Sequence, residues 1–283
     1  MGADLSIAGS ADPLVVNFAR RRGISLHPLI HNGGYDPDVA RRILETPQRR
    51  ATAAARIAAL VLDHGFDGIN MDFEGTFGTS RDQYSDLLER LVAHLKPSRK
   101  WVTVDVVPQL KPASSYPASS WAAPYDYRRL GAACDAVMLM AYEYSVQRPG
   151  PISPLWWVRQ VIQYARTQIH PGKLVLGFPF YGKHWRIAEG RTSVSSVTQV
   201  EALDLLAWSG APLQRPARDA TPRFSWWDAG VQHVVHFDDM QSLAAKLQQL
   251  DGQISGAAFW RLGKEDAGQW TVIGDWLNHR QRR

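Results

Sequence analysis

Short apolar runs alternate with helical patterns along most of this chain of 283 residues. Apolar runs of about four to eight residues indicate buried strands, and apolar positions spaced three and four apart indicate helices. Their alternation is typical of repeated βα units around a parallel sheet. The expected strands are Ser25–His31, Gly68–Phe73, Val102–Val107, Ala136–Ala141, Leu174–Phe178 and Gly256–Trp260.

Capping residues mark the ends of the expected helices. Thr46 and Pro47 begin a helix that runs to His64, and Gly65 is in position to end it. Asp238 is the expected N-cap of a later helix. The apolar stripe of that helix is Met240, Leu243, Ala244, Leu247 and Leu250. We interpret such stripes as core faces.

The βα rhythm stops between Gly182 and Phe237. This segment holds one amphipathic piece, Val200–Ser209, then a linker with three prolines, then the aromatic and β-branched run "RFSWWDAGVQHVVHF". It predicts a small α+β insertion between the fifth and sixth expected strands. The rhythm itself fits both a closed barrel and an open doubly wound sheet.

Charge and composition exclude several classes of protein. The net charge is +5, but the arginine clusters accompany no nucleic-acid motif, so we interpret them as solvated helix faces and expect no nucleic-acid partner. The single Cys134 excludes an internal disulfide and a cysteine metal site. No apolar run has the length of a membrane span, and "MGADLSIAGSADP" lacks a signal-peptide pattern.

The stretch "FDGINMDFEG" departs from the pattern of a buried parallel strand. Asn70, Asp72 and Glu74 alternate with three apolar residues and therefore share one face of the strand. We expect the Asn70 amide to hydrogen-bond Asp72 without adding a third charge. Parallel strands covered on both faces are usually apolar throughout. Neighbouring buried carboxyl groups raise the pKa of one of them, which supplies an acid that keeps its proton near neutral pH.

Three interpretations fit this polar face from the local pattern. It is a buried polar network that fixes strand register, a divalent-metal site built from Asp72, Glu74 and His27 or His31, or an acid–base site that cleaves a glycosidic bond. The metal interpretation has no closely spaced ligand pair in its favour. Glu74, last in the row, falls at the carboxyl end of the strand, where βα folds place active sites.

Further segments extend the pattern of a known family. "FDGINMDFEG" resembles the DGxDxDxE signature of family 18 glycoside hydrolases, the chitinase-like enzymes. "DAVMLMAYE" is similar to that family's sixth-strand motif, "LVLGFPFYGKHW" to its seventh-strand motif and "GAAFWRLGKED" to its eighth-strand tryptophan motif. "WVTVDVVPQ" falls where the fifth strand belongs. Asn70 and the ending from Trp260 to Asp266 resemble the bacterial branch linked to LysM modules and to spore-cortex or peptidoglycan hydrolysis.

The resemblance implies a TIM (β/α)8-type barrel and a retaining glycoside hydrolase. Glu74 is then the general acid/base, and Asp72 orients the substrate's 2-acetamido group, whose carbonyl oxygen attacks the anomeric carbon. Tyr142 hydrogen-bonds that oxygen, and Trp260 forms the apolar floor under the cleaved sugar. The other implied substrate-binding residues are Asn70, Met140, Glu143 and Tyr181. Neither a metal nor a cofactor is implied.

The sequence departs from the family pattern in two ways. Glu143 stands where the family usually has Asp, which adds a methylene to a carboxylate expected near the acetamido group. If Gly68–Glu74 is the fourth barrel strand, Ser25–His31 is the third, and the first two βα units are lacking. Such a gap exposes unpaired strand edges, so we expect low stability, self-association, or a partner chain that replaces the missing strands.

These expectations give a domain plan and two function hypotheses. Residues 1–182 and 237–283 form an N-terminally incomplete barrel catalytic domain, and residues 183–236 form the α+β insertion before the last strand. The expected substrate is a β-linked glycan containing N-acetylglucosamine, either peptidoglycan or chitin oligomers. The alternative is a catalytically weak, lectin-like glycan-binding module. Family resemblance implies secretion or a cell-envelope location, although no signal peptide is visible.

Overall fold

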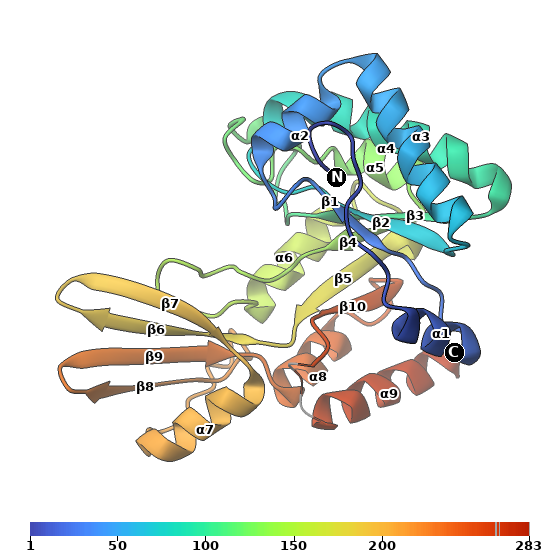
Figure 1. The fold of residues 1–283 in the computed structure, drawn as a ribbon. Helices are drawn as coiled ribbons and strands as arrows, with labels where there is room; N and C mark the ends of the chain where they lie inside the picture. Colours follow the sequence, from blue (N-terminus) through green and yellow to red (C-terminus); the bar gives the residue numbers. More distant parts are fainter. Residues whose placement is uncertain (264, 266, 283) are drawn as a thin grey trace. The chain divides into compact units, whose positions relative to one another are not determined.

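The computed structural model describes residues 1–263, 265 and 267–282. The chain forms two compact units (Figure 1). The first comprises Met1–Met140 and Tyr164–Val175, and the second comprises Ala141–Gln163 and Leu176–Arg283. Lys264 and Asp266, which belong to the expected eighth-strand motif, lie outside the described residues.

A sheet of six strands has the order β1-β2-β3-β4-β5-β10. Its strands are β1 (Leu29–His31), β2 (Gly68–Asp72), β3 (Trp101–Val106), β4 (Ala136–Leu139), β5 (Leu174–Pro179) and β10 (Gly256–Trp260). All six strands expected from the apolar runs are present. The first is shorter than expected, because Pro28 has no N–H to donate to a ladder and β1 begins after it.

The pairs β1–β2, β2–β3 and β3–β4 are parallel, which matches the expected βα rhythm. Asn70 of β2 is the register partner of Leu29 on one side and Thr103 on the other. On the opposite face of β2, Ile69, Met71 and Phe73 are fully buried. Phe73 stacks on Tyr84 of the helix that follows, so the apolar face of β2 is the helix-covered one.

Helices of the first unit pack against these strands and against one another. They are α1 (Pro13–Arg22), α2 (Pro37–Leu44), α3 (Pro47–Asp63), α4 (Arg81–Leu95) and α5 (Tyr127–Ala133), with short 3-10 turns at Gly78–Ser80, Lys96–Ser98, Ala113–Ser115 and Pro171–Lys173. In Figure 1, α2, α3, α4 and α5 lie together over β1, β2 and β3. The expected start of α3 is confirmed, because the Thr46 hydroxyl accepts a hydrogen bond from the Arg49 amide.

The second unit contains an antiparallel sheet of four strands with the order β7-β6-β9-β8. Its strands are β6 (Gly182–Ala188), β7 (Arg191–Val197), β8 (Arg223–Asp228) and β9 (Val231–Phe237), and α7 (Gln199–Ser209) lies beside them (Figure 1). Ala202 of α7 packs into a core with Val197, Phe224, Val235 and Phe237. Thr198 and Glu201 form a capping box at the start of α7.

The remaining helices of the second unit are α6 (Leu155–Ala165), α8 (Met240–Gln249) and α9 (Ala267–Gln281). The last two residues of α6 belong to the first unit. The expectation that Asp238 caps α8 is wrong, because Asp239 is the N-cap and accepts from the Ser242 amide. Asp238 is instead buried and paired with Lys246 of α8. Among the described residues, no helix has both the length and the apolar content needed to cross a membrane.

Candidate functional site

In the four neighbouring strands β1 to β4, the register places one row of side chains side by side on the same face of the sheet. Asp72 of β2 is the register partner of His31 of β1, and Asp105 of β3 is the partner of Met138 of β4. Because Met71 pairs with Val104, Asp72 and Asp105 occupy the next positions on adjacent strands. Partners in a parallel sheet point to the same face, so two carboxyl groups meet near the carboxyl ends of β2 and β3.

Asp72 is buried, and its two carboxyl oxygens differ in their surroundings. Oδ2 accepts a hydrogen bond of 3.0 Å from the Tyr35 hydroxyl, whereas buried Oδ1 has no hydrogen-bond partner among the described residues. Burial raises the pKa of Asp72, and the hydrogen bond from Tyr35 and the charge of His31 oppose that rise. The Tyr35 bond therefore favours the ionised carboxylate.

Asp105 is also buried, and its carboxyl group holds the Asn70 side chain. Asn70 Nδ2 lies 3.2 Å from Asp105 Oδ1 and 3.3 Å from Met138 Sδ. The expectation that Asn70 would hydrogen-bond Asp72 is therefore wrong, because the amide reaches across to β3. Burial, followed by the charge of Asp72, raises the pKa of Asp105 to about 8, although the Asn70 bond lowers it and Glu74 adds to the rise.

Glu74 follows the end of β2 and is held through its main chain by Asn32. The Asn32 side chain accepts from the Glu74 amide at 2.9 Å and donates to the Glu74 carbonyl at 2.9 Å. Asn32 itself is fully buried just after β1. The next residue, Gly75, has a φ of 119°, and a Cβ there would lie 3.3 Å from the Tyr35 carbonyl oxygen and from Pro37 Cβ. A glycine is therefore favoured immediately after Glu74.

A second group of predicted residues lies in the second unit. Glu143 Oε1 accepts a hydrogen bond of 3.2 Å from the Tyr181 hydroxyl and pairs with Lys183 Nζ at 2.7 Å. The Tyr142 and Tyr181 rings meet edge to face, with centroids 6.3 Å apart. Burial, followed by the charge of Glu143, raises the pKa of Tyr181, so this hydroxyl stays a hydrogen-bond donor.

Met140 and Trp260 lie at the carboxyl ends of two strands of the larger sheet. Met140 comes directly after β4, and its amide donates to the Val106 carbonyl. Trp260 ends β10 and is 46% exposed, while its carbonyl accepts from the Phe180 amide at 2.7 Å. The peptide bond between Trp260 and Arg261 is cis. An exposed indole at a strand end is available for stacking on a ligand.

Comparison with known proteins gives the family. Residues 29–265 match the family model described as Glycosyl hydrolases family 18. The chain belongs to glycosyl hydrolases family 18. The cortical fragment-lytic enzyme of Bacillus anthracis is 28% identical over 250 residues, which is 86% of this chain and 57% of that protein. The match confirms the family expected from the motifs.

Two solved structures share the fold of this chain. The Bacillus cereus spore cortex-lytic enzyme SleL has a TM-score of 0.88 at 25% identity, over 96% of this chain and 64% of that one. A chitinase from Chromobacterium violaceum has a TM-score of 0.89 at 25% identity, over 98% and 88%. The fold is thus α/β and of the TIM-barrel type. The chain spans between 55% and 57% of the length of two curated relatives that it matches.

The structure brings together some of the predicted residues of this family 18 chain within each unit. Asn70, Asp72 and Glu74 lie in the first unit, with Met140 at its boundary, and Tyr142, Glu143, Tyr181 and Trp260 lie in the second. The polar contacts also include four residues that sequence reasoning missed. They are Asn32, Tyr35, Asp105 and Lys183. Asp105 was the most visible of these, as a single carboxylate within the valine-rich run "WVTVDVV".

The described residues contain no group of three or more His, Cys, Asp or Glu side chains that is arranged to hold a metal ion. His31, which the metal interpretation used, has its Nδ1 occupied as an acceptor from the Gly34 amide at 3.1 Å. Burial lowers the pKa of His27, the other histidine in that interpretation. The geometry around Asp72 is that of a carboxyl pair with phenol and amide donors.

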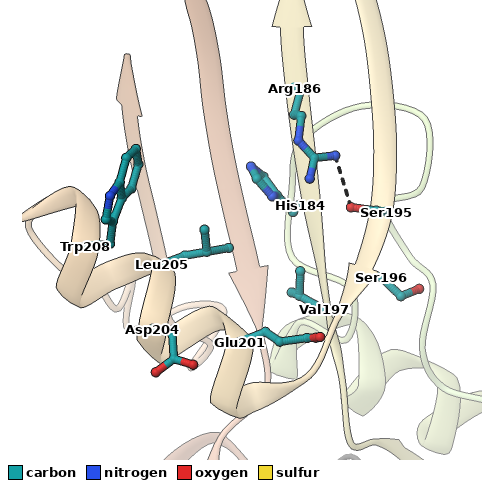
Figure 2. Close-up of a pocket in the computed structure, with 9 residues that line it drawn as sticks. All are labelled: His184, Arg186, Ser195, Ser196, Val197, Glu201, Asp204, Leu205 and Trp208. Carbon is teal, nitrogen blue, oxygen red and sulfur yellow. Dashed lines mark hydrogen bonds between the residues drawn. The ribbon is translucent and has the colours of Figure 1, made fainter. Parts of the chain in front are cut away.

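A pocket of about 460 Å³ lies elsewhere, between β6, β7 and α7 of the second unit (Figure 2). His184 and Arg186 of β6 line it, and Arg186 donates to Ser195 Oγ. Burial lowers the pKa of His184 to about 4, so its ring is neutral at pH 7. None of the predicted catalytic or substrate-binding residues lines this pocket.

Proposed function

We propose that this family 18 chain is a retaining glycoside hydrolase that cleaves β-linked glycans containing N-acetylglucosamine. The observation that carries this proposal is the buried pair Asp72 and Asp105 beside Glu74 at the carboxyl ends of β2 and β3. Burying two carboxyl groups beside each other is energetically costly. Such costly arrangements are concentrated at catalytic sites, so the pair supports a catalytic role. Family membership supplies the reaction class.

Glu74 is the proposed general acid/base. Its main chain is fixed at both the amide and the carbonyl by Asn32, which limits the positions that the side chain can reach. In the forward step its carboxylic acid protonates the glycosidic oxygen as the bond to the leaving sugar breaks. The resulting carboxylate then removes a proton from the water that opens the intermediate, and Glu74 regains its starting form.

Asp72 is proposed to act on the 2-acetamido group of the sugar that is cleaved. Oδ1 has no hydrogen-bond partner among the described residues, and we propose that it accepts from the acetamido N–H when substrate binds. An ionised Asp72 stabilises the positive charge that develops when the acetamido carbonyl oxygen attacks the anomeric carbon and forms an oxazolinium ion. Attack by the substrate's own oxygen, followed by attack by water, gives overall retention.

Residues of the second unit have roles implied by the family pattern. We propose that Tyr142 donates a hydrogen bond to the acetamido carbonyl oxygen and that Trp260 supplies an apolar surface for the sugar ring. Tyr181 and Glu143 are proposed to bind substrate hydroxyl or amide groups. Their mutual hydrogen bond, with Lys183 on Glu143, supports a fixed polar wall. Asn70 and Met140 complete the proposed substrate-binding set.

Peptidoglycan, including spore cortex, is the proposed natural substrate class. The chemistry requires only a 2-acetamido group on the cleaved sugar, so chitin oligomers satisfy it as well. Relatives are named for both activities, as cortical fragment-lytic enzyme and as chitinase. The named cortex-lytic relatives include a protein 28% identical over 86% of this chain, and this supports the peptidoglycan assignment.

We propose a correspondence between these strands and those of the family barrel. In it, β1 to β5 and β10 match the third to eighth barrel strands, and residues 183–236 are an α+β insertion before the last of them. The segment Gly182–Phe237 forms a separate antiparallel sheet, which supports this division. Each proposed catalytic residue of the first unit then follows or ends a strand of the barrel sheet.

The test compares wild type with Glu74→Gln on N-acetylglucosamine oligomers and on peptidoglycan. Release of reducing ends by wild type and its loss in Glu74→Gln are the expected results. Glu89→Gln is the matched control, because it makes the same Glu-to-Gln change on α4, at a residue that pairs with Arg129 and has no proposed catalytic role. If wild type releases no more reducing ends than Glu74→Gln, the proposed hydrolase activity is refuted. Glycan binding that persisted in that case would favour the lectin-like alternative.

A further inference from the structure

Asp105 is a buried carboxyl group in a strand that is otherwise apolar at its end. Its neighbours on β3, Val104 and Val106, are fully buried, and Asp105 itself is 9% exposed. Removing a carboxylate from water without a charged partner is strongly unfavourable, so such a group takes a proton or gains a cation. No cationic side chain hydrogen-bonds to Asp105 in the described residues, where Asn70 is its donor.

The neighbour of Asp105 on the next strand is the carboxyl group of Asp72. Adjacent parallel strands are about 4.8 Å apart, so side chains at equivalent positions on one face are close. Two carboxylates at that separation repel, and the pair favours the state in which one of them keeps a proton. Asp72 Oδ1 and Asn70 Oδ1 are both buried acceptors without a hydrogen-bond partner among the described residues. A proton on Asp105 adds a donor between them.

We propose that Asp105 is a positioning residue that forms one carboxyl pair with Asp72, in which Asp105 holds the proton and the Asn70 amide while Asp72 carries the negative charge. This inference rests on the proposed function, because the charge on Asp72 is the one that faces the substrate's acetamido group. Asp105 then acts through Asp72 and Asn70 and does not itself touch the reacting atoms. The carboxyl partner of Asp72 thus comes from a neighbouring strand.

The donors around each member decide where the proton lies. Asp72 accepts from the Tyr35 hydroxyl and feels the charge of His31, and both favour its ionised form. Among the described residues, the side-chain donor to Asp105 is the Asn70 amide, and Asp105 faces the negative charges of Asp72 and Glu74. The phenols of Tyr84 and Tyr125, the other titratable groups in reach, are buried and remain neutral. The raised pKa of Asp105, about 8, agrees with this order.

The direct test is a carbon-13 titration of the aspartate carboxyl groups, which needs no turnover. In wild type we expect one aspartate with a midpoint near pH 8 that disappears in Asp105→Asn. In Asp72→Asn the neighbouring charge is gone, and the Asp105 midpoint should fall by about one pH unit or more. Thr103→Val is the matched control, because Thr103 is buried two residues earlier on β3 and bonds the Ile69 carbonyl. It should leave the midpoint unchanged.

Enzyme kinetics give the second readout on the same variants. Asp105→Asn keeps a neutral, hydrogen-bonding side chain and should retain most of kcat, whereas Asp105→Leu should lose about tenfold or more in kcat with a smaller change in KM. The bend near pH 8 in the wild-type profile of kcat/KM should be absent in Asp105→Asn and present in Thr103→Val. Equal losses in the Asn and Leu variants with unchanged profiles would show a packing role and overturn the proposal.

The two proposals fail in distinguishable ways. An Asp105 midpoint in the ordinary range near pH 4, or one that Asp72→Asn leaves in place, refutes the carboxyl pair even if wild type cleaves glycans. Absence of hydrolysis together with the expected titration refutes the proposed function and leaves the pair itself supported. Because the titration uses wild type, a variant that fails to fold does not remove the test.

Discussion

Asn32 clamps the main chain of Glu74, accepting from its amide and donating to its carbonyl, each at 2.9 Å. The same amide nitrogen of Asn32 also donates to the Asp36 carbonyl at 2.8 Å, which ties the clamp to the start of α2. The main chain of Glu74 is therefore held in place although Glu74 lies beyond the end of β2. A general acid needs such anchoring, because misplacement by about 1 Å can cost roughly 100-fold in rate.

Replacing Asn32 is expected to reduce activity through the position of Glu74. Asn32→Ala leaves the Glu74 amide and carbonyl without these partners and should lower kcat by roughly tenfold to 100-fold. It should also lower the free energy of unfolding by about 1–3 kcal/mol, because buried polar groups are left unpaired. Asn32→Asp keeps an acceptor for the Glu74 amide and should fall between wild type and Asn32→Ala. Steady-state kinetics and urea unfolding check both effects, and an Asn32→Ala enzyme with wild-type kcat would contradict the clamp.

Tyr35 is expected to set the lower end of the pH range of activity. Its hydroxyl donates to Asp72 Oδ2 at 3.0 Å and favours the ionised carboxylate, so Tyr35→Phe should raise the pKa of Asp72 further. The acid limb of kcat/KM should then move to higher pH by about one unit. Tyr116→Phe is the control, since Tyr116 bonds the Leu110 amide on an exposed loop. If the acid limb of kcat/KM does not move in Tyr35→Phe, ionisation of Asp72 does not control that limb, and the prediction is contradicted.

The strands and the polar face of β2 were predictable because they depend on local patterns. Apolar runs mark β2 to β5 and β10, and the alternation of Asn70, Asp72 and Glu74 with apolar residues shows a polar face without knowledge of any partner. β1 was overextended most, because Pro28 has no N–H to donate to the ladder, and β2, β3 and β4 also end one or two residues before their expected ends. Periodicity within one strand is a property of the chain itself, and it survives folding.

The partners of these residues were not predictable because they depend on register and on loop paths. Asn70 was expected to bond Asp72 two residues away, but side chains at that spacing on a strand are farther apart than neighbours on adjacent strands, and the amide bonds Asp105. Asn32 and Tyr35 belong to the loop after β1, and they reach β2 only because the two strands are adjacent. One sequence cannot specify such pairings by periodicity.

The buried carboxyl pair also predicts how stability changes with pH. A carboxyl group whose pKa is raised in the folded state binds its proton more tightly there than in the unfolded chain, so its contribution is most favourable below about pH 4. For Asp105 that contribution is lost as pH rises from about 4 to about 8, by up to about 1.4 kcal/mol per pH unit. Asp72 contributes with the same sign.

Asp105→Asn removes this dependence while keeping the size of the side chain. Relative to wild type, the variant should gain in free energy of unfolding as pH rises from 5 to 8, and the difference should level off above the wild-type pKa of about 8. Urea unfolding at several pH values between 5 and 9 measures the difference directly. Thr103→Val serves as the control for loss of a buried polar group on the same strand. A difference between Asp105→Asn and wild type that does not change with pH would mean that Asp105 is ionised throughout.

Asp238 and Lys246 form a buried ion pair between the end of β9 and α8, and it predicts a double-mutant result. Burial raises the pKa of Asp238 and lowers that of Lys246, while each group's charge opposes the shift in the other. Lys246→Met should cost about 3–5 kcal/mol, because it leaves a buried carboxyl without its partner. Adding Asp238→Leu should recover much of that loss, since two apolar groups bury without an unpaired charge. Thermal and urea unfolding of the four forms give the coupling energy, and costs that simply add would show that the pair contributes no mutual stabilisation.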